Sequence, residues 1–590
     1  LKTVLFVDFQ RPLPKAPVPS LDHSLDRYVE YAEVVAQGIH VPLQKTRSAV
    51  DEFRKSGDVY QKRLLRLAEQ SNNWINQFWL PEMYLRIRLP LPVNTSPAYI
   101  FPQQNFKNDD EWLRYTALLI RGFVEYKNKI DTKQVEREVS TGKVKVNMCM
   151  QQYERILACY RQPGTGEDEH LLKPKRNHEN EHAFVVHTRI GGDLLPFADI
   201  LFQLQQVLRM SEARAGLVVA VGAAGVGDRE RAAAFWDTMR EVDVNCKSLT
   251  WAQEALFVVC LDDEDKKSVR NHVDLDAQEK DLVEQGKHIL TGGGSRGYGL
   301  NRWYDATIQL VVSRSGTNGL CIEHSCAEGI VIINMAESAL RFERENRKRN
   351  LCNSGAKGNC LGLLFYFYPP ANLKAAVGPS LICVLLLTQE LDLEVLLFND
   401  FGREFIKKAG FSPDGFVQLA LQLAHFMLHG YLVSTYESAS LRRFRSGRVD
   451  NIRANTKEAL EWVQAMTRDD SKNLMGEGID NHLCALLVLA RDSVENGEIK
   501  TLPAIFRDPL WTELMRFPLS TSQVTTSPDI TNCYLCYGAV VRDGYGCAYN
   551  LQKDAIIFAP SAFKSNPRTD LVAFKDSIRS ALHAMKNLVQ

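Results

Sequence analysis

The chain has no surplus of charge of either sign. Its 71 lysines and arginines are matched by 71 aspartates and glutamates, so the formal net charge is zero. Proteins that bind the nucleic-acid backbone gather lysine and arginine on one face, because affinity for phosphate depends on them. We therefore expect no nucleic-acid partner, although a small basic pocket is compatible with a balanced total.

The sequence also lacks an apolar run that is both long and free of helix breakers. A transmembrane helix needs roughly 20 apolar residues, and the most apolar stretch, residues 361–388, is interrupted by Lys374. We expect its prolines, including Pro379, to break a helix there, and we predict no integral membrane span. The apolar run at the start is too short for a signal peptide, and without an initiator methionine we expect the chain to begin inside a longer one.

The cysteines show no disulfide or zinc pattern. Thirteen is an odd number, and a chain of 590 residues needs no covalent staples, so we expect reduced thiols and a cytoplasmic protein. Cys533 and Cys536 form a C-x-x-C pair, but Cys547 alone does not complete a ligand set. We expect this pair to be structural and predict no metal site.

The chain length and the alternation of helical and β-like segments predict two packed α/β domains. Single cores stop growing beyond roughly 250–300 residues, and apolar residues make up 45% of the chain, as in ordinary globular proteins. Helical periodicity appears over residues 24–36, 51–78 and 229–242, and β-like runs over 256–261 and 308–312. The composition changes near residue 390, which divides a 1–390 domain from a 391–590 domain.

Three patterns resemble ligand sites weakly. Residues 292–297 match G-x-G-x-x-G, but a dinucleotide fingerprint opens a helix, and a β-like run follows here, which favours a flexible turn. His178 with His182, and His425 with His429, have the i, i+4 spacing of half a metal site. Neither pair has a third ligand at a telling distance, so we expect both to be structural.

His324 is the more informative histidine. It follows a β-like run and a turn, and Glu328 and Gly329 come four and five residues later. A histidine at the end of a strand can be held in one orientation while its free nitrogen faces a cavity and acts as a base. The alternative is a histidine that is merely hydrogen-bonded within a loop.

Several separated motifs resemble the choline/carnitine acyltransferase family. The resemblance covers the chain from about residue 13 to its end, except for residues 341–390 and a shortened segment at 466–478. The motifs are His324-x-x-x-Glu328-Gly329, Asn301-Arg-Trp-Tyr-Asp305, Tyr436-Glu-Ser-Ala-Ser440, Gly447-Arg-Val-Asp-Asn-Ile-Arg453 and Leu519-Ser-Thr-Ser-Gln523. The resemblance implies a monomer of two similar domains, each a mixed sheet flanked by helices as in chloramphenicol acetyltransferase, with an active-site tunnel between them.

Residues 403–414 have the features of an anion site. Ser412 is placed as a helix N-cap with Pro413 in the first turn, and the lysines just upstream can meet a phosphate there. The alternative is a pair of solvated lysines. The resemblance implies that CoA is bound by Arg403, Lys407, Lys408, Ser412, Pro413, Asp414, Ser438 and Gln523.

A hydroxyl for the oxyanion is available in residues 519–523. Ser520 and Ser522 alternate along a β-like run and so project to one side. The alternative is a plain polar strand edge. The resemblance implies that Ser522 donates to the oxyanion, and the chain has no G-x-S-x-G motif of a serine hydrolase.

The acceptor is predicted from charge. Carnitine carries a carboxylate. The resemblance implies that carnitine enzymes of the family have an arginine and two threonines in the matching motifs, whereas this chain has Asn481, Val449 and Asn451 at those positions. A buried carboxylate without a cation is costly, so a quaternary ammonium such as choline fits better. Aromatic faces attract such a cation by about 0.5–2 kcal/mol each, and the resemblance implies this role for Tyr84, Tyr436 and Tyr537.

The predicted reaction is acetylation of choline by acetyl-CoA, a co-substrate, without any other cofactor. His324 takes the hydroxyl proton, Ser522 stabilises the oxyanion, and Glu328 orients groups through an ion pair. The resemblance implies acetylcholine synthesis in the cytoplasm, at nerve terminals. Two alternatives stay open: a carnitine acyltransferase, and a CoA-binding homologue with impaired catalysis.

Overall fold

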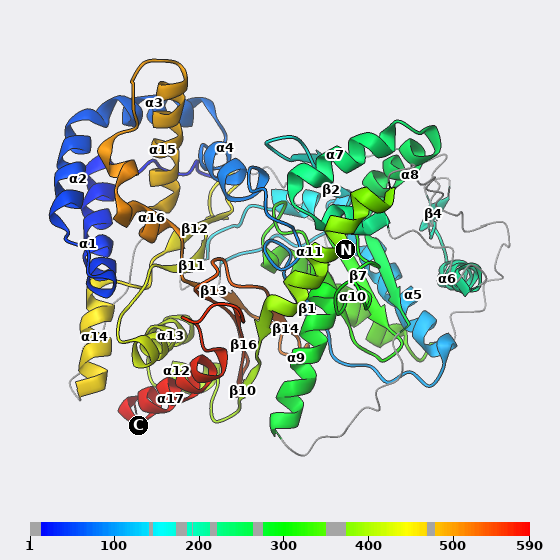
Figure 1. The fold of residues 1–590 in the computed structure, drawn as a ribbon. Helices are drawn as coiled ribbons and strands as arrows, with labels where there is room; N and C mark the ends of the chain where they lie inside the picture. Colours follow the sequence, from blue (N-terminus) through cyan, green and yellow to red (C-terminus); the bar gives the residue numbers. More distant parts are fainter. Residues whose placement is uncertain are drawn as a thin grey trace, which may run out of the picture.

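The computed structural model describes residues 13–140, 145–172, 186–190, 193–212, 221–263, 275–349, 373–468 and 478–589. Two β-sheets lie at the centre, and helices surround them (Figure 1). The helices are α1 (Leu21–Ile39), α2 (Gln44–Ser56), α3 (Asp58–Gln70), α4 (Ile75–Leu80), η1 (Pro81–Leu85), α5 (Asp109–Asp131), η2 (Gln151–Arg155), α6 (Phe197–Glu212), η3 (Val221–Val226), α7 (Arg229–Arg240), α8 (Asp243–Glu254), α9 (Leu275–Thr291), α10 (Gly329–Asn346), α11 (Leu373–Glu390), α12 (Arg403–Lys408), α13 (Pro413–His429), α14 (Lys457–Arg468), α15 (Asp480–Glu495), η5 (Ala504–Arg507), α16 (Pro509–Met515) and α17 (Leu571–Val589).

The strands form two large sheets and two short ribbons. They are β1 (Ala98–Ile100), β2 (Cys159–Gln162), β3 (Glu169–Leu172), β4 (Arg189–Ile190), β5 (Asp193–Leu194), β6 (Val258–Asp262), β7 (Ile308–Ser313), β8 (Asn318–Ile322), β9 (Leu391–Leu393), β10 (Leu396–Phe398), β11 (Thr435–Ser440), β12 (Val449–Ile452), β13 (Leu519–Val524), β14 (Tyr534–Cys536), β15 (Tyr545–Leu551) and β16 (Ile556–Phe563). Both large sheets are mixed, which confirms the expected α/β class.

The first sheet has the order β14-β1-β8-β7-β6, with β6 and β7 parallel and the other pairs antiparallel. Every residue of β7 and β8 is buried. Helices α5 and α10 pack together beside it, and Gly122 makes this possible because a Cβ there would lie 2.8 Å from Ala339 Cα. Strand β8 therefore ends in a rigid setting, directly before His324.

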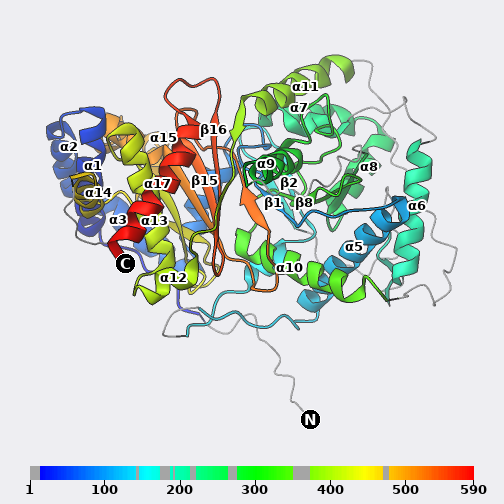
Figure 2. The same ribbon diagram turned by 90° about the horizontal axis from the view of Figure 1, so that it is seen from below.

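The second sheet has the order β10-β16-β15-β13-β11-β12, and β9 also pairs with β16. Strand β13 is parallel to β11 and β15. Helices α13 and α17 lie against one face of this sheet (Figure 2), and their apolar residues share a core with Leu519 and Tyr549. Val524 and Ala548, which point to the opposite face, belong to the core of the first sheet. The two sheets thus share a core between them.

A third core joins the N-terminal helices to residues 479–514. Residues of α1 to α4 pack with those of α15 and α16. The second sheet contains only strands from residues 391–563, whereas β14 completes the first sheet. The division at residue 390 stays a prediction, and these crossings show that each half contributes an element to the other.

Some predicted elements differ in detail. The expected helices at 24–36 and 229–242 are α1 and α7, and the expected strands are β6 and β7. The helical stretch over 51–78 is divided among α2, α3 and α4, because Gly57 and a polar segment at 71–74 interrupt it. Gly and Asn disfavour helix interiors.

The expectation that Pro379 breaks a helix is wrong. Pro379 lies inside α11, exposed to solvent, while Val384 and Leu387 on the same helix are buried. Proline removes one backbone hydrogen bond, and burial of the helix elsewhere offsets that loss. Among the described residues, no helix has the length and apolar character needed to cross a membrane.

Candidate active site

His324 lies in the turn between β8 and α10, as the sequence predicts. Its imidazole ring stacks on Tyr84, with the ring centroids 6.2 Å apart and the planes 11° apart. Tyr84 belongs to η1, a single π-helical turn of a kind often found at functional sites. The Nδ1 atom of His324 is buried without a hydrogen-bond partner. A histidine held this way has the fixed orientation that a general base needs.

Arg448 holds the His324 turn in place. Its Nε donates to Glu328 Oε1 at 2.6 Å, one Nη donates to the carbonyl of His324 at 3.0 Å, and the other donates to the carbonyl of Ser325. Its guanidinium also lies over the rings of Trp79 and Tyr84, at 4.9 and 5.5 Å. The guanidinium presents five donors in a rigid planar fork and so reaches all three acceptors, whereas the ammonium of lysine is a compact point charge.

Glu328 forms the ion pair that the sequence predicts. Burial opposes its ionisation, but the adjacent Arg448 holds the pKa of Glu328 below its usual value. The carboxylate is therefore ionised at neutral pH and paired with Arg448. The ion pair is confirmed, and the orienting role of Glu328 in catalysis stays a prediction.

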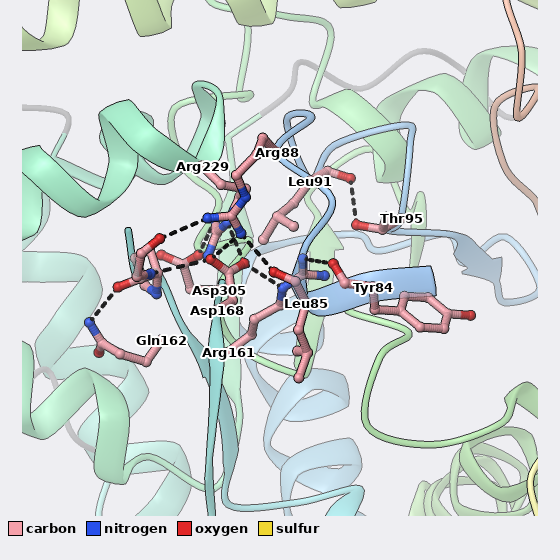
Figure 3. A network of polar contacts seen from close by, with 12 residues as sticks. Tyr84, Leu85, Arg88, Leu91, Thr95, Arg161, Gln162, Asp168, Arg229 and Asp305 are labelled. Atoms are coloured by element: carbon pink, nitrogen blue, oxygen red, sulfur yellow. Dashed lines mark hydrogen bonds and ion pairs between the residues drawn. The ribbon is translucent and has the colours of Figure 1, made fainter. Parts of the chain in front are cut away.

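Figure 3 shows a buried network of charges, which reaches the same turn through the hydrogen bond from Arg161 to Glu323. Asp168 accepts hydrogen bonds from Arg161, Arg229 and Arg88, at 2.7, 2.7 and 2.8 Å. Arg229 also pairs with Asp305, and Arg161 donates to the backbone carbonyl of Tyr84. Buried charges are tolerated only when they are paired and hydrogen-bonded, so these contacts tie β2 to α7 and to the loops that carry Asp168 and Asp305.

The second sheet carries hydroxyl groups on the face that points toward the first sheet. In its register Tyr436 pairs with Ser520, and alternate residues share a face, so Ser438 and Ser522 follow on that same face. Ala548, the partner of Ser522, packs in the core of the first sheet, so this face points toward the first sheet. Ser522 is half-buried there. Its oxyanion role stays a prediction.

Tyr436 connects the two sides. Burial raises the pKa of its phenol, and the neighbouring Tyr84 and Glu328 raise the same pKa further, so the three groups lie close together. Tyr436 also meets Phe517 edge to face, with centroids 5.5 Å apart. The rings of Tyr436 and Tyr84 offer aromatic faces of the kind that attract a cation.

Tyr537 and Val449 are tied to the fold. The Tyr537 hydroxyl donates to the carbonyl of Ser520 at 2.8 Å and accepts from the Cys547 amide at 3.3 Å. Val449 is buried in the third core, among residues of α4 and α15. Both contacts position β12 and β13, and the predicted contacts of these residues with an acceptor stay untested.

Asn451 and Asn481 lie beside two carboxylates. Asn451 donates to Asp480 and accepts from the backbone amide of Glu437 at 2.8 Å. Asn481 donates to the carbonyl of Val449 at 2.9 Å, while its own Oδ1 is buried without a partner. Asp450 accepts from both backbone amides, and burial together with Asp480 raises the pKa of Asp450 to about 7.

The residues predicted to bind CoA form a more open region. Lys408, Ser412, Ser438 and Gln523 are exposed, and so is Lys407, whose ammonium lies 3.7 Å from Glu404. Ser412 caps α13, and Pro413 occupies its first turn, as predicted. Asp414 differs, because its carboxylate turns inward and accepts from the Tyr549 hydroxyl. Arg403 begins α12, which packs against α13.

The weaker patterns have structural roles. Residues 292–299 form a turn after α9 with positive φ at Gly292, Gly293 and Gly294, and no helix begins there. His425 bonds to the carbonyl of Tyr431 and His429 to the hydroxyl of Tyr545. His178 and His182 lie outside the described residues. Within the described part of the chain, no cluster of three metal ligands occurs, and the cysteines are free thiols.

Sequence reasoning missed the supporting residues of the site. Arg448 and Asp305 stand inside motifs that the sequence singles out, which was the available signal, but their partners are distant in the chain. Arg161, Asp168 and Arg229 belong to no recognisable pattern. Such contacts depend on the fold, since 61 residues separate Asp168 from Arg229 and 124 separate Arg448 from His324.

His324 lies half-buried in a strand-to-helix turn and stacks on Tyr84, an arrangement in which an imidazole can act as a general base toward a hydroxyl group. A family model described as "Choline/Carnitine o-acyltransferase" matches residues 16–580, and the chain belongs to this family. The protein is therefore an acyltransferase, in a family whose substrates are choline or carnitine and CoA.

Individual relatives agree with this placement. Choline O-acetyltransferases from Danio rerio and Homo sapiens are 33% and 34% identical to the chain, covering 98% of it and 93% and 79% of the relative. Carnitine O-acetyltransferase from Columba livia is 32% identical, covering 98% of the chain and 94% of the relative. Among solved structures, the SgcC5 protein from Streptomyces globisporus is 11% identical with a TM-score of 0.32, covering 84% of the chain and 93% of that structure.

Replacing Arg448 tests the anchoring of the turn. Arg448→Lys keeps the charge but cannot reach Glu328 and both carbonyls, so we expect the free energy of unfolding to fall by about 1–3 kcal/mol for the buried acceptors left unpaired. We expect kcat to fall about 10-fold or more, because the base is misplaced. Denaturant unfolding and acetyl-transfer assays measure both. Arg443→Lys, at an exposed neighbour, is the control, and equal behaviour of the two variants would contradict the anchoring role.

Proposed function

We propose that the protein transfers the acetyl group of acetyl-CoA to the hydroxyl of choline, forming acetylcholine. The choice of choline as the acceptor depends on one observation: Asn451 and Asn481 lie beside Asp450 and Asp480. The proposal includes a cytoplasmic monomer without a further cofactor. Free thiols among the described cysteines are compatible with that compartment.

The chemistry follows from the His324 turn. The imidazole removes the proton of the choline hydroxyl while that oxygen attacks the thioester carbonyl, and it then protonates the departing thiolate of CoA. Ser522 donates to the oxyanion of the tetrahedral intermediate from the opposite sheet. Glu328 is occupied by Arg448, so it orients the turn and does not take the proton.

The charges beside Asn481 support choline over carnitine. Arg453 is committed to Asp480 at 2.8 Å and to the Ser434 hydroxyl at 2.7 Å. With Arg453 paired to Asp480, the carboxylate of carnitine would have no free cationic partner beside Asn481, and a buried carboxylate without one costs free energy. Choline brings only a positive charge, which the acidic residues and the Tyr436 ring favour.

Carnitine acetylation is the second candidate. It is supported by the match to the Columba livia enzyme at 32% identity. The two candidates share His324, Ser522 and the CoA region, so they differ only in the acceptor. A comparison of kcat/KM for choline and carnitine separates them.

Removing the base tests the chemistry. We expect His324→Ala to lower kcat for acetylcholine formation by about 10²–10⁴-fold, the usual contribution of a positioned general base. KM for acetyl-CoA is expected to change little, since the residues predicted to bind CoA lie on α12, α13, β11 and β13 and not in the turn that carries His324. The matched control is His583→Ala on α17. His583 lies 3.4 Å from the exposed carboxylate of Asp400, and neither residue belongs to the predicted site. Turnover near the wild-type rate in His324→Ala would rule out this base.

Adding a cation tests the acceptor. Asn481→Arg supplies a partner for a carboxylate, and we expect the ratio of kcat/KM for carnitine over choline to rise about 10- to 100-fold, as for a gained charged contact. Competition between the two acceptors measures this ratio. Asn496→Arg, at the exposed end of the same helix, adds the same charge outside the site. An unchanged ratio in Asn481→Arg would contradict the placement of the acceptor.

A further inference from the structure

The β2–β3 ribbon presents two side chains to the His324 turn. These strands are antiparallel, and Arg161 stands directly opposite His170 in their register. Residues directly opposite in such a pair project to the same face. The side chains of Arg161 and His170 therefore act on the same neighbour, and that neighbour is the turn that carries His324.

The two side chains contact the residues on either side of the histidine. Arg161 donates to the carboxylate of Glu323, which precedes His324, at 2.9 Å. His170 Nε2 lies 2.6 Å from the hydroxyl of Ser325, which follows it. Ser325 in turn donates to Glu323 at 2.5 Å. Glu323 and Ser325 are fully buried, so these contacts are shielded from water.

The directions of these bonds fix the tautomer of His170. Burial opposes ionisation of Glu323, but Arg161 and Ser325 hold the pKa of Glu323 below its usual value, so its carboxylate only accepts. The single proton of the Ser325 hydroxyl is given to that carboxylate. Ser325 must then accept from His170, whose Nε2 carries the proton. Burial lowers the pKa of His170 to about 4, so this imidazole is neutral at neutral pH.

We propose that His170 is a positioning residue for the acyl transfer, which acts by donating from Nε2 to Ser325 and thereby holding His324 in its reactive orientation. Arg448 holds the backbone carbonyl groups of the turn, whereas Arg161 and His170 hold the side chains of Glu323 and Ser325. A turn anchored through both its backbone and its side chains has little freedom, and small misplacements of a base are costly. This inference rests on the proposed function for the predicted fall in kcat, but not for the anchoring of the turn.

The test compares two substitutions at one position. His170→Leu removes the donor, and we expect kcat to fall about 10- to 100-fold while KM for choline and acetyl-CoA stays within about twofold. His170→Gln keeps an N–H near the position of Nε2, and we expect it to restore most of kcat. A loss of kcat equal in both variants, or a kcat of His170→Leu within twofold of wild type, would overturn the proposal.

A double-mutant cycle separates positioning from general support of the fold. If His170 acts through Ser325, His170→Leu lowers kcat in the wild-type chain but has no further effect in Ser325→Ala. Full additivity of the two losses would overturn the proposal. Glu169→Leu is the control, because Glu169 is the exposed neighbour of His170 on β3.

Hydrogen exchange provides a readout that does not depend on the reaction. We expect the amides of residues 323–328 to exchange faster in His170→Leu than in wild type, and at the wild-type rate in Glu169→Leu. Unchanged exchange in His170→Leu would overturn the anchoring. Absence of acetyl transfer by the wild-type chain would contradict the proposed function alone, so the two failures are distinguishable.

Discussion

The guanidinium of Arg448 is the contact on which the site depends. It comes from the start of β12 in the second sheet and bonds to the turn that follows β8 in the first sheet. Taking this charge out of water is costly, and the cost is offset because one planar group satisfies a carboxylate, two carbonyls and two aromatic faces. The same contact joins the halves of the molecule and sets the direction of His324.

The balanced charge of the chain includes buried clusters in which opposite charges are paired. The zero net charge of the sequence hides clusters in which buried arginines and carboxylates neutralise each other, such as Arg161, Arg229, Asp168 and Asp305 (Figure 3). Around Asn451 and Asn481 lie Asp450 and Asp480, and the cation Arg453 is already paired with Asp480. The proposed preference for choline depends on this arrangement, because the carboxylate of a zwitterion needs a free cationic partner.

Features that depend on neighbouring residues could be predicted from the sequence. The alternation of Ser520 and Ser522, the cap at Ser412 and the turn at His324 depend on neighbours in sequence, and the structure shows all three. The supporting arginines were not predictable, because each binds a residue 60 or more positions away or sits on another element. Pro379 failed as a helix breaker for the same reason, since packing of α11 outweighs the local preference.

Contacts between distant segments cross residue 390, the position at which the composition predicts a domain boundary. Strand β14 completes the first sheet, and α1 to α4 pack with α15 and α16. Neither crossing has a signature in the sequence, because each depends on which apolar faces remain uncovered after the sheets form.

The most direct measurement is the rate of acetyl transfer from acetyl-CoA by the purified wild-type chain, with choline and carnitine supplied as competing acceptors. The proposed function predicts acetylcholine as the main product and a larger kcat/KM for choline. A larger kcat/KM for carnitine would contradict it.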